Sequence, residues 1–206
     1  MKIAILANGK SVNNFINDPI NQKFDEVWGL NQQGAWKGLK LDKLFVMDDL
    51  KLRMPFYSSY DFVNWLKTYE QPIITSRSYP EWPTSQAYPI KEVCHYFGVP
   101  TGIAMYSTVD YMIALAVMQG AIELHLFGVD MIDKSLSEEM RIATAHWIGV
   151  AHARGVLVKT YFGSFFQYLT NPGHCMECGM YGYAKRPRIE DLINPDYFEA
   201  YKNEGG

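Results

Sequence analysis

The stretch that decides the fold is KIAILANGKS, residues 2–11, in which an apolar run from Lys2 to Ala7 leads into Asn8-Gly9-Lys10-Ser11. Consecutive aliphatic residues are typical of a strand that is buried on both faces, as in parallel sheets. Glycine allows a tight turn, and we expect Ser11 to cap a helix over 12–17. A strand, a turn and a helix in this order predict the opening unit of an α/β fold.

The rest of the chain repeats this alternation. We expect strands over 24–30, 43–47, 72–75, 123–129 and 156–160, and helices over about 58–68, 108–120 and 138–154. Gly120 and Gly155 are placed to end two of these helices. The pattern predicts a Rossmann-like parallel sheet flanked by helices, with right-handed crossovers. We predict that residues 77–92, which are rich in proline and tyrosine, form an irregular, aromatic-rich lid over the open side of the sheet.

Composition sets outer limits on function. At 206 residues, 48% hydrophobic and 20% charged, the chain can build a sizeable core, which excludes a disordered or coiled-coil protein. A net charge of -3 argues against binding nucleic acid through bulk charge, although a local basic patch stays open. The sequence contains no apolar run of membrane-spanning length. Three cysteines form no set of disulfide pairs, so we expect a cytoplasmic protein.

Polar residues close four of the expected strands. They are Asn8 with the turn that follows it, Asn31, Asp48 and Asp130. Because ligands bind beyond the carboxyl ends of parallel strands, these residues predict a site at one edge of the sheet. Ser107 or Thr108 caps the helix that follows, and its free N–H groups suit a phosphate or carboxylate. Asn and Asp also favour turns for local reasons, so an ordinary strand-to-helix turn is the alternative at each position.

Other reactive residues give weaker signals. His146 is a candidate general base on a helix, although a structural role is the commoner one, and we expect His125 to lie in the core. Cys175 and Cys178 form one C-x-x-C pair, too few ligands to predict a zinc site, so we expect no metal ligands. The one basic cluster, 185–188, could contact a phosphate backbone or be a solvated tail.

Several of these motifs together resemble a known family. The turn at 8–11, the F-D-x-x-W-x-x-N-Q pattern at 24–32, and Leu126-Phe127-Gly128-Val129-Asp130 are similar to the bacterial CMP-sialic-acid-dependent sialyltransferases of lipooligosaccharide synthesis. The chain also resembles small Rossmann-like proteins of bacteriophages. That likeness rests on Gly128 to Met131, Trp147 to Gly155 and Tyr181-Gly182-Tyr183.

The resemblance implies a nucleotide-sugar site. It places the nucleotide phosphate at Asn8, Gly9 and Ser11, and the donor at Asn31. It also places Ser107 or Thr108 against the nucleotide, with Gly128 and Asp130 closing the neighbouring strand. Lys10 stands where the family has a proline, and its charge suits a diphosphate donor such as a UDP-sugar. The donor is thus a UDP- or CMP-sugar, with a divalent cation as an open possibility.

These expectations define a domain scheme and three hypotheses. Residues 1–165 form the nucleotide-sugar-binding domain, and residues 166–206 an extension on or near the site. The first hypothesis is a glycosyltransferase with Asp48, Asp130 or His146 as base. Its acceptor is a hydroxyl group, and a phage-like origin adds a hydroxymethylated DNA base as a candidate acceptor. The second is a nucleotide-binding accessory protein without transfer activity, and the third a metal-dependent phosphate enzyme such as a pyrophosphokinase.

Overall fold

The structure is a computed structural model that describes residues 1–17, 23–32, 39–53, 60–98, 104–132, 137–161, 164–166 and 170. The chain divides into two compact units, Met1–Gln167 and Tyr168–Gly206. Thr170 is the one residue of the second unit that is described, so every described helix and strand belongs to the first. Several predictions fall outside the described residues: Cys175 with Cys178, the basic cluster at 185–188, and the motif at 181–183.

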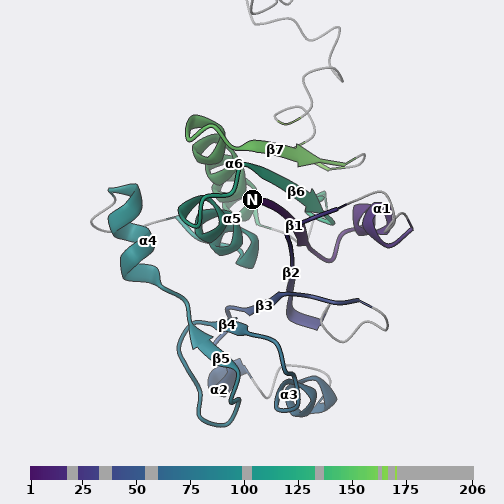
Figure 1. Ribbon diagram of the computed structural model, residues 1–206, viewed down its shortest axis with the longest axis vertical. Helices are drawn as coiled ribbons and strands as arrows, with labels where there is room; N and C mark the ends of the chain where they lie inside the picture. Colours follow the sequence, from purple (N-terminus) through teal and green to yellow (C-terminus); the bar gives the residue numbers. More distant parts are fainter. Residues whose placement is uncertain are drawn as a thin grey trace, which may run out of the picture. The chain divides into compact units, whose positions relative to one another are not determined.

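The first unit is built on a seven-stranded sheet with the order β5-β4-β3-β2-β1-β6-β7 (Figure 1). The strands are β1 (Lys2–Leu6), β2 (Glu26–Leu30), β3 (Lys43–Val46), β4 (Ile73–Thr75), β5 (Ser85–Ala87), β6 (Glu123–Phe127) and β7 (Leu157–Thr160). All neighbouring pairs are parallel. The predicted Rossmann-like parallel sheet is therefore confirmed.

The strand order creates a switch point in the middle of the sheet. From β1 the chain first adds strands on one side, β2 to β5, and later returns to add β6 and β7 on the other. Leu6 at the end of β1 is in register with both Gly29 of β2 and Phe127 of β6. Because the connections leave β1 and β6 in opposite directions, a crevice opens beyond the ends of these two strands.

Helices cover both faces of the sheet. They are η1 (Lys10–Val12), α1 (Asn13–Ile16), α2 (Leu50–Arg53), α3 (Tyr60–Leu66), α4 (Ile90–Phe97), α5 (Thr108–Met118) and α6 (Glu138–Ala153). Ile3 and Ile5 of β1 face the layer of α5 and α6, with Met112 and Ile148 in the same core. Alternate residues such as Leu6 face the other layer, which includes α3. No helix of the described part is long and apolar enough to cross a membrane.

The predicted helix ends are confirmed at positions where serine or glycine stands at the end of the helix. Ser107 is the N-cap of α5, as predicted. Gly120 and Gly155 follow the ends of α5 and α6 with φ of 81° and 77°. These left-handed conformations cost glycine little, and they stop each helix at the expected place.

Two local predictions are wrong. Part of the stretch 77–92 is regular: β5 pairs in parallel with β4, and α4 begins at Ile90 and continues to Phe97. The strand is short and polar, Ser-Gln-Ala, because it lies at the edge of the sheet. Ser11 does not cap a helix, since Gly9 is the N-cap of η1 and the Ser11 side chain bonds elsewhere.

His125 of β6 is buried, as predicted, and belongs to a polar cluster with Glu123 and Tyr161. Its ring nitrogens are 2.6 Å from the Tyr161 hydroxyl and 2.7 Å from the Glu123 carboxylate. Lys159 donates to the same carboxylate at 2.6 Å, and Lys2 lies 3.8 Å from it. The cluster therefore joins β1, β6 and β7 through one acidic side chain.

Candidate functional site

The turns after β1 and β6 touch through two glycines. The Gly9 amide donates to the Gly128 carbonyl at 2.8 Å. A Cβ on Gly9 would lie 2.5 Å from that carbonyl oxygen, and one on Gly128 would lie 2.0 Å from the Ala7 carbonyl oxygen. Gly128 also has a φ of 70°. Both positions therefore require glycine, and the two turns form one rigid unit at the switch point.

Hydrogen bonds of the buried Ser11 and Asp130 side chains also connect the same two turns. The Asp130 carboxylate accepts from the Ser11 amide at 2.9 Å and from the Ser11 hydroxyl. The Ser11 hydroxyl oxygen accepts in turn from the Gly128 amide at 2.8 Å. Both side chains are buried. Asp130 thus holds Ser11 of the first turn through both of its oxygens, one on the backbone amide and one on the side-chain hydroxyl.

The N-terminus of α5 borders the same crevice. Asp110 is fully buried below it, and one carboxylate oxygen accepts from the amides of Tyr106 and Ser107 at 2.9 and 2.8 Å. The other oxygen accepts from the Thr144 hydroxyl of α6 at 2.6 Å. Burial raises the pKa of Asp110, although these hydrogen bonds act to lower it. The start of α5 is thereby fixed to α6.

Among the described residues, two other than glycine have a left-handed backbone, and both line the crevice. Asn31 and Met131 have φ of 52°. Asparagine adopts this conformation readily, whereas it strains methionine by about 1–2 kcal/mol. The Met131 carbonyl accepts from Arg141 Nε at 2.8 Å, which helps to hold the strained turn. The Oδ1 atom of Asn31 is buried and has no hydrogen-bond partner in the described structure. Strain and an unmet acceptor at one place are typical of a binding site.

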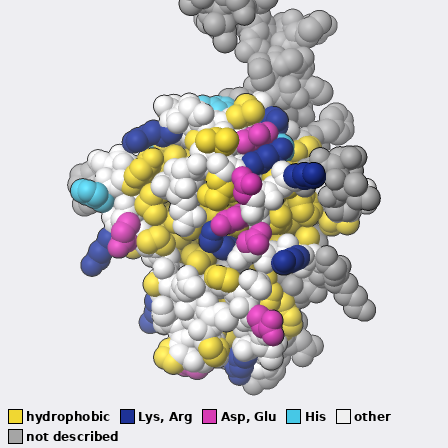
Figure 2. Space-filling model, viewed as in Figure 1, with side chains coloured by type: hydrophobic (Ala, Val, Ile, Leu, Met, Phe, Trp, Pro, Cys, Tyr) yellow, Lys and Arg dark blue, Asp and Glu magenta, His cyan; other side chains and the backbone are white. Residues whose placement is uncertain are grey.

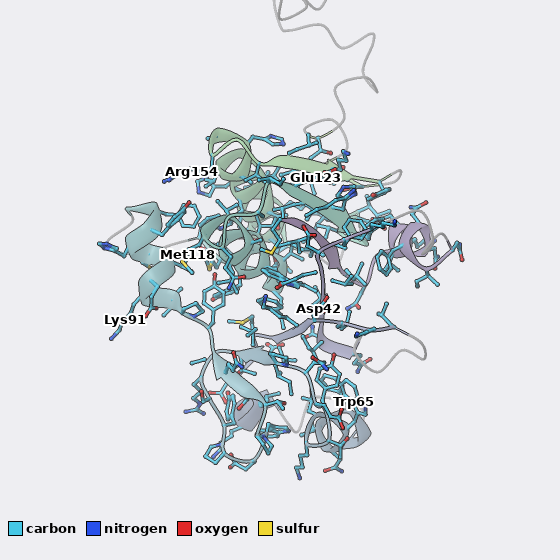
Figure 3. All side chains as sticks on the ribbon, in the orientation of Figure 1. Asp42, Trp65, Lys91, Met118, Glu123 and Arg154 are labelled. Carbon is cyan, nitrogen blue, oxygen red and sulfur yellow. The ribbon has the colours of Figure 1, made fainter. Side chains whose placement is uncertain are left out.

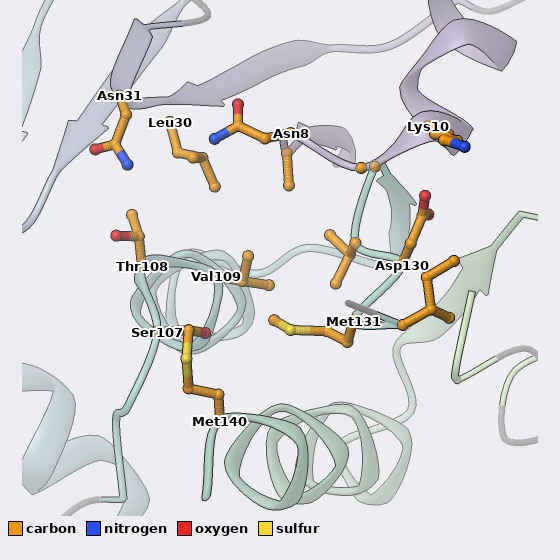
Figure 4. A pocket seen from close by; sticks show the side chains of 15 residues that line it. Asn8, Lys10, Leu30, Asn31, Ser107, Thr108, Val109, Asp130, Met131 and Met140 are labelled. Carbon is orange, nitrogen blue, oxygen red and sulfur yellow. The ribbon is translucent and has the colours of Figure 1, made fainter. Parts of the chain in front are cut away.

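These features enclose a cavity of about 730 Å³. It is lined by Ala7, Asn8, Gly9, Lys10, Leu30, Asn31, Ser107, Thr108, Val109, Gly128, Val129, Asp130, Met131, Ile132 and Met140. Figure 4 shows Asn8, Leu30 and Asn31 along one wall and the start of α5 along the opposite wall, beside Met131 and Met140. The volume lies within the range of small-molecule sites. Polar groups lie mainly near the strand ends, and apolar side chains fill the remaining wall.

Most residues predicted for the site meet in this cavity. Asn8, Gly9, Lys10, Asn31, Ser107, Thr108, Gly128 and Asp130 line it. Ser11 lies directly behind the lining, bonded to Asp130. Two candidate bases do not line the cavity: Asp48, which follows β3, and His146, which is exposed on α6.

The positions of Asp48 and His146 have simple geometric causes. Asp48 lies two strands away from the switch point, since β2 separates β3 from β1. His146 is two turns beyond the N-terminal end of α6, of which Met140 reaches the cavity. Strand ends share an edge of the sheet, but the edge is several strands wide.

Sequence reasoning missed Asp110, Met131 and Arg141. Asp110 stood three residues after the predicted cap Ser107, in the position where an acidic side chain can complete a capping box. That signal was present in the sequence. No local signal marks Met131 for a left-handed backbone. No group of three or more metal-binding side chains was found in the described part of the chain.

Comparisons with known proteins give a structural result. No protein-family model matches the chain, and no curated protein matches its sequence. Among solved structures, the sialyltransferase CstII from Campylobacter jejuni, in complex with the substrate analogue cytidine-5'-monophosphate, is similar with a TM-score of 0.53 and 17% identity. That match covers 83% of this chain and 84% of CstII. Monomeric CstII is similar with a TM-score of 0.50 and 15% identity, over 83% and 85% of the two chains. At this identity the similarity shows that the chain has the Rossmann-like α/β fold of these transferases.

Proposed function

We propose that the protein is a glycosyltransferase that takes its sugar from a nucleotide-activated donor. The observation that carries the proposal is the cavity at the switch point, where the Gly9–Gly128 contact, Asn31 and the N-terminus of α5 meet. Amides at a helix N-terminus favour an anion, and apolar side chains such as Met131 and Met140 offer a surface for a ring. The structurally similar sialyltransferase was solved with a cytidine nucleotide, which supports this assignment.

The reaction would exchange one bond at the anomeric carbon of the sugar for another. An acceptor hydroxyl oxygen forms the new bond to this carbon, while the bond from the carbon to the phosphate oxygen breaks. The hydroxyl proton passes to a base, and the phosphate leaves with the bonding electrons. The α5 N-terminus and Lys10 would stabilise the charge that grows on the leaving phosphate.

The sequence offers three candidate bases, Asp48, Asp130 and His146. Of the three candidates, Asp130 lines the cavity, but both of its oxygens accept from Ser11. We therefore assign Asp130 to positioning the turn at residues 8–11, which would bind the phosphate. Asp48 and His146 lie outside the cavity lining, so either would need the acceptor to extend beyond it.

We propose that the acceptor is a hydroxymethylated base of phage DNA. We also propose that the reaction takes place in the cytoplasm. Figure 2 shows basic and acidic side chains interspersed on the face in view. A DNA acceptor would then bind through local contacts rather than a broad basic surface.

Nucleotide binding is testable by thermal unfolding with UDP- and CMP-sugars. A ligand at about 100 times its Kd adds about 2.7 kcal/mol to the free energy of unfolding, which raises Tm by several degrees. Asn31→Gly removes the amide but keeps the left-handed backbone accessible, so we expect it to weaken the shift. Gln32→Gly is the matched control, because Gln32 is exposed and does not line the cavity. The absence of any shift with every nucleotide sugar would refute the proposal.

A second candidate function is nucleotide binding without sugar transfer. The observation in its favour is that Asp130, the acidic side chain in the described lining, is already bonded to Ser11. A protein that binds the donor but releases no nucleotide with any acceptor would fit this alternative. Release of nucleotide only when an acceptor is added would support transfer instead.

A further inference from the structure

We propose that Lys10 makes the cavity selective for nucleotides that carry a second anionic group beyond the first phosphate. The inference rests on the proposed function and names the class of donor. Two chemistries share this feature: the β-phosphate of a nucleoside diphosphate sugar, and the carboxylate of an acidic sugar on a nucleoside monophosphate. Both place a further negative charge next to the first phosphate.

The cavity offers an anion two separate positive regions. Ser107, Thr108 and Val109 bring the start of α5 to the lining, and a helix N-terminus is equivalent to roughly half a positive charge. Lys10 adds a full charge from the turn after β1. Figure 4 shows Thr108 with Asn31 at one end of the cavity and Lys10 with Asp130 at the other. A single phosphate held at α5 would leave Lys10 without an anion.

Within the described residues, Lys10 forms neither an ion pair nor a hydrogen bond through its ammonium group, and it is exposed. Asp130 is its neighbour in the lining, but the carboxylate bonds to Ser11 instead. By contrast, Lys51 and Lys159 pair with carboxylates at 2.8 and 2.6 Å. Lys10 is also the one Lys or Arg among the described lining residues. A lysine binds phosphate or carboxylate as a point charge, so both anions fit.

The experiment compares matched nucleotides by titration calorimetry. UMP is measured against UDP, and CMP against CDP, with the wild-type protein. We expect each diphosphate to bind about tenfold more tightly, a difference of about 1.4 kcal/mol. Lys10→Met keeps most of the side-chain stem and removes the charge, so it should abolish the preference, while Lys10→Arg should retain it. A preference that shrinks as salt increases would agree with a charge effect at an exposed site.

Lys91→Met is the matched control, since Lys91 is exposed on α4 and outside the cavity lining (Figure 3). It should keep the wild-type preference. Two donors then identify the source of the second charge: a UDP-sugar, and a CMP-sugar whose sugar carries a carboxylate. The donor whose second anion contacts Lys10 should lose affinity in Lys10→Met, and the other should not. Equal binding of mono- and diphosphates, or a preference that survives Lys10→Met, overturns this inference and leaves the proposed function standing. Failure of all four nucleotides to bind overturns both.

Discussion

Gly128 allows the turns after β1 and β6 to approach each other. Any side chain there would overlap the Ala7 carbonyl, and its φ of 70° adds strain for every residue with a Cβ. The nearby Ser11–Asp130 bonds depend on the same spacing. A single methyl group at this position would therefore push the two turns apart and disturb the hydrogen bonds between them.

We expect Gly128→Ala to lower the free energy of unfolding by more than about 2 kcal/mol, since overlap adds to the cost of the left-handed backbone. Urea unfolding followed by circular dichroism measures this change. Gly149→Ala is the control, because Gly149 is in α6 and a Cβ there meets no atom within 4 Å. This second variant should gain about 0.5–1 kcal/mol. Equal stability of the two variants would show that the turns can move apart.

Sequence reasoning identified most lining residues because polar side chains after parallel strands share one edge. Asn8, Asn31 and Asp130 followed from that rule. The bond between Ser11 and Asp130 did not, since the two residues are 119 positions apart and neither carries a local signal for the other. Asp48 met the same rule but lies too far along the edge.

At the level of elements, Asp110 connects the start of α5 to α6. Its carboxylate accepts two backbone amides and the Thr144 hydroxyl while it is fully buried. An ionised group without water is costly, and burial raises its pKa above the ordinary value of 3.8. The folded protein therefore holds this proton more readily than the unfolded chain does.

Asp110→Asn and Asp110→Ala separate the charge from the hydrogen bonds. The amide of Asn can accept from both backbone amides and donate to Thr144, so this variant should keep most of the stability. Asp110→Ala leaves buried donors unpaired and should cost about 2 kcal/mol or more. Because the pKa of Asp110 is raised, its contribution to stability falls as pH rises from 3.8 through the folded value. Urea unfolding across this range should show the Asn variant gaining on the wild type as pH rises, and an unchanging difference would contradict the prediction.

Elements with an apolar pattern were predictable even where they are short, as in β4 (Ile73–Thr75), whereas β5 and α4 were not. Helix α5 and strand β1 carry strong apolar patterns and clear end signals. By contrast, β5 has three residues with no apolar alternation, and α4 begins directly after Pro89, in a region dominated by proline and tyrosine. Their structure comes from pairing with β4 and from packing on α5, which a local pattern does not contain.

For the molecule as a whole, the Glu123 cluster ties three strands together and responds to acid. A hydrogen bond from Lys159, supported by one from His125, lowers the pKa of Glu123 to about 2. Burial lowers the pKa of His125 from its ordinary value of 6.5. Both shifts mean that the folded state takes up these protons less readily than the unfolded chain, so both make stability fall as pH falls.

We expect the free energy of unfolding to fall in two stages on acidification. Protonation linked to His125 acts as pH falls below 6.5, and protonation linked to Glu123 acts between 4.5 and about 2. His125→Gln should remove the first stage and leave much of the second, as measured by urea unfolding across the pH range. His95→Gln, an exposed position on α4, should retain both stages. A first stage that persists in His125→Gln would assign it to another group.

The central place of β1 also has a consequence for synthesis on the ribosome. This strand emerges before both of its partners, and the later partner, β6, begins only at Glu123. Until that segment leaves the exit tunnel, one edge of an aliphatic strand stays open to chaperones or to other nascent chains. The crevice at the switch point is thus completed late in translation, and a chain truncated before Glu123 would present that open edge permanently.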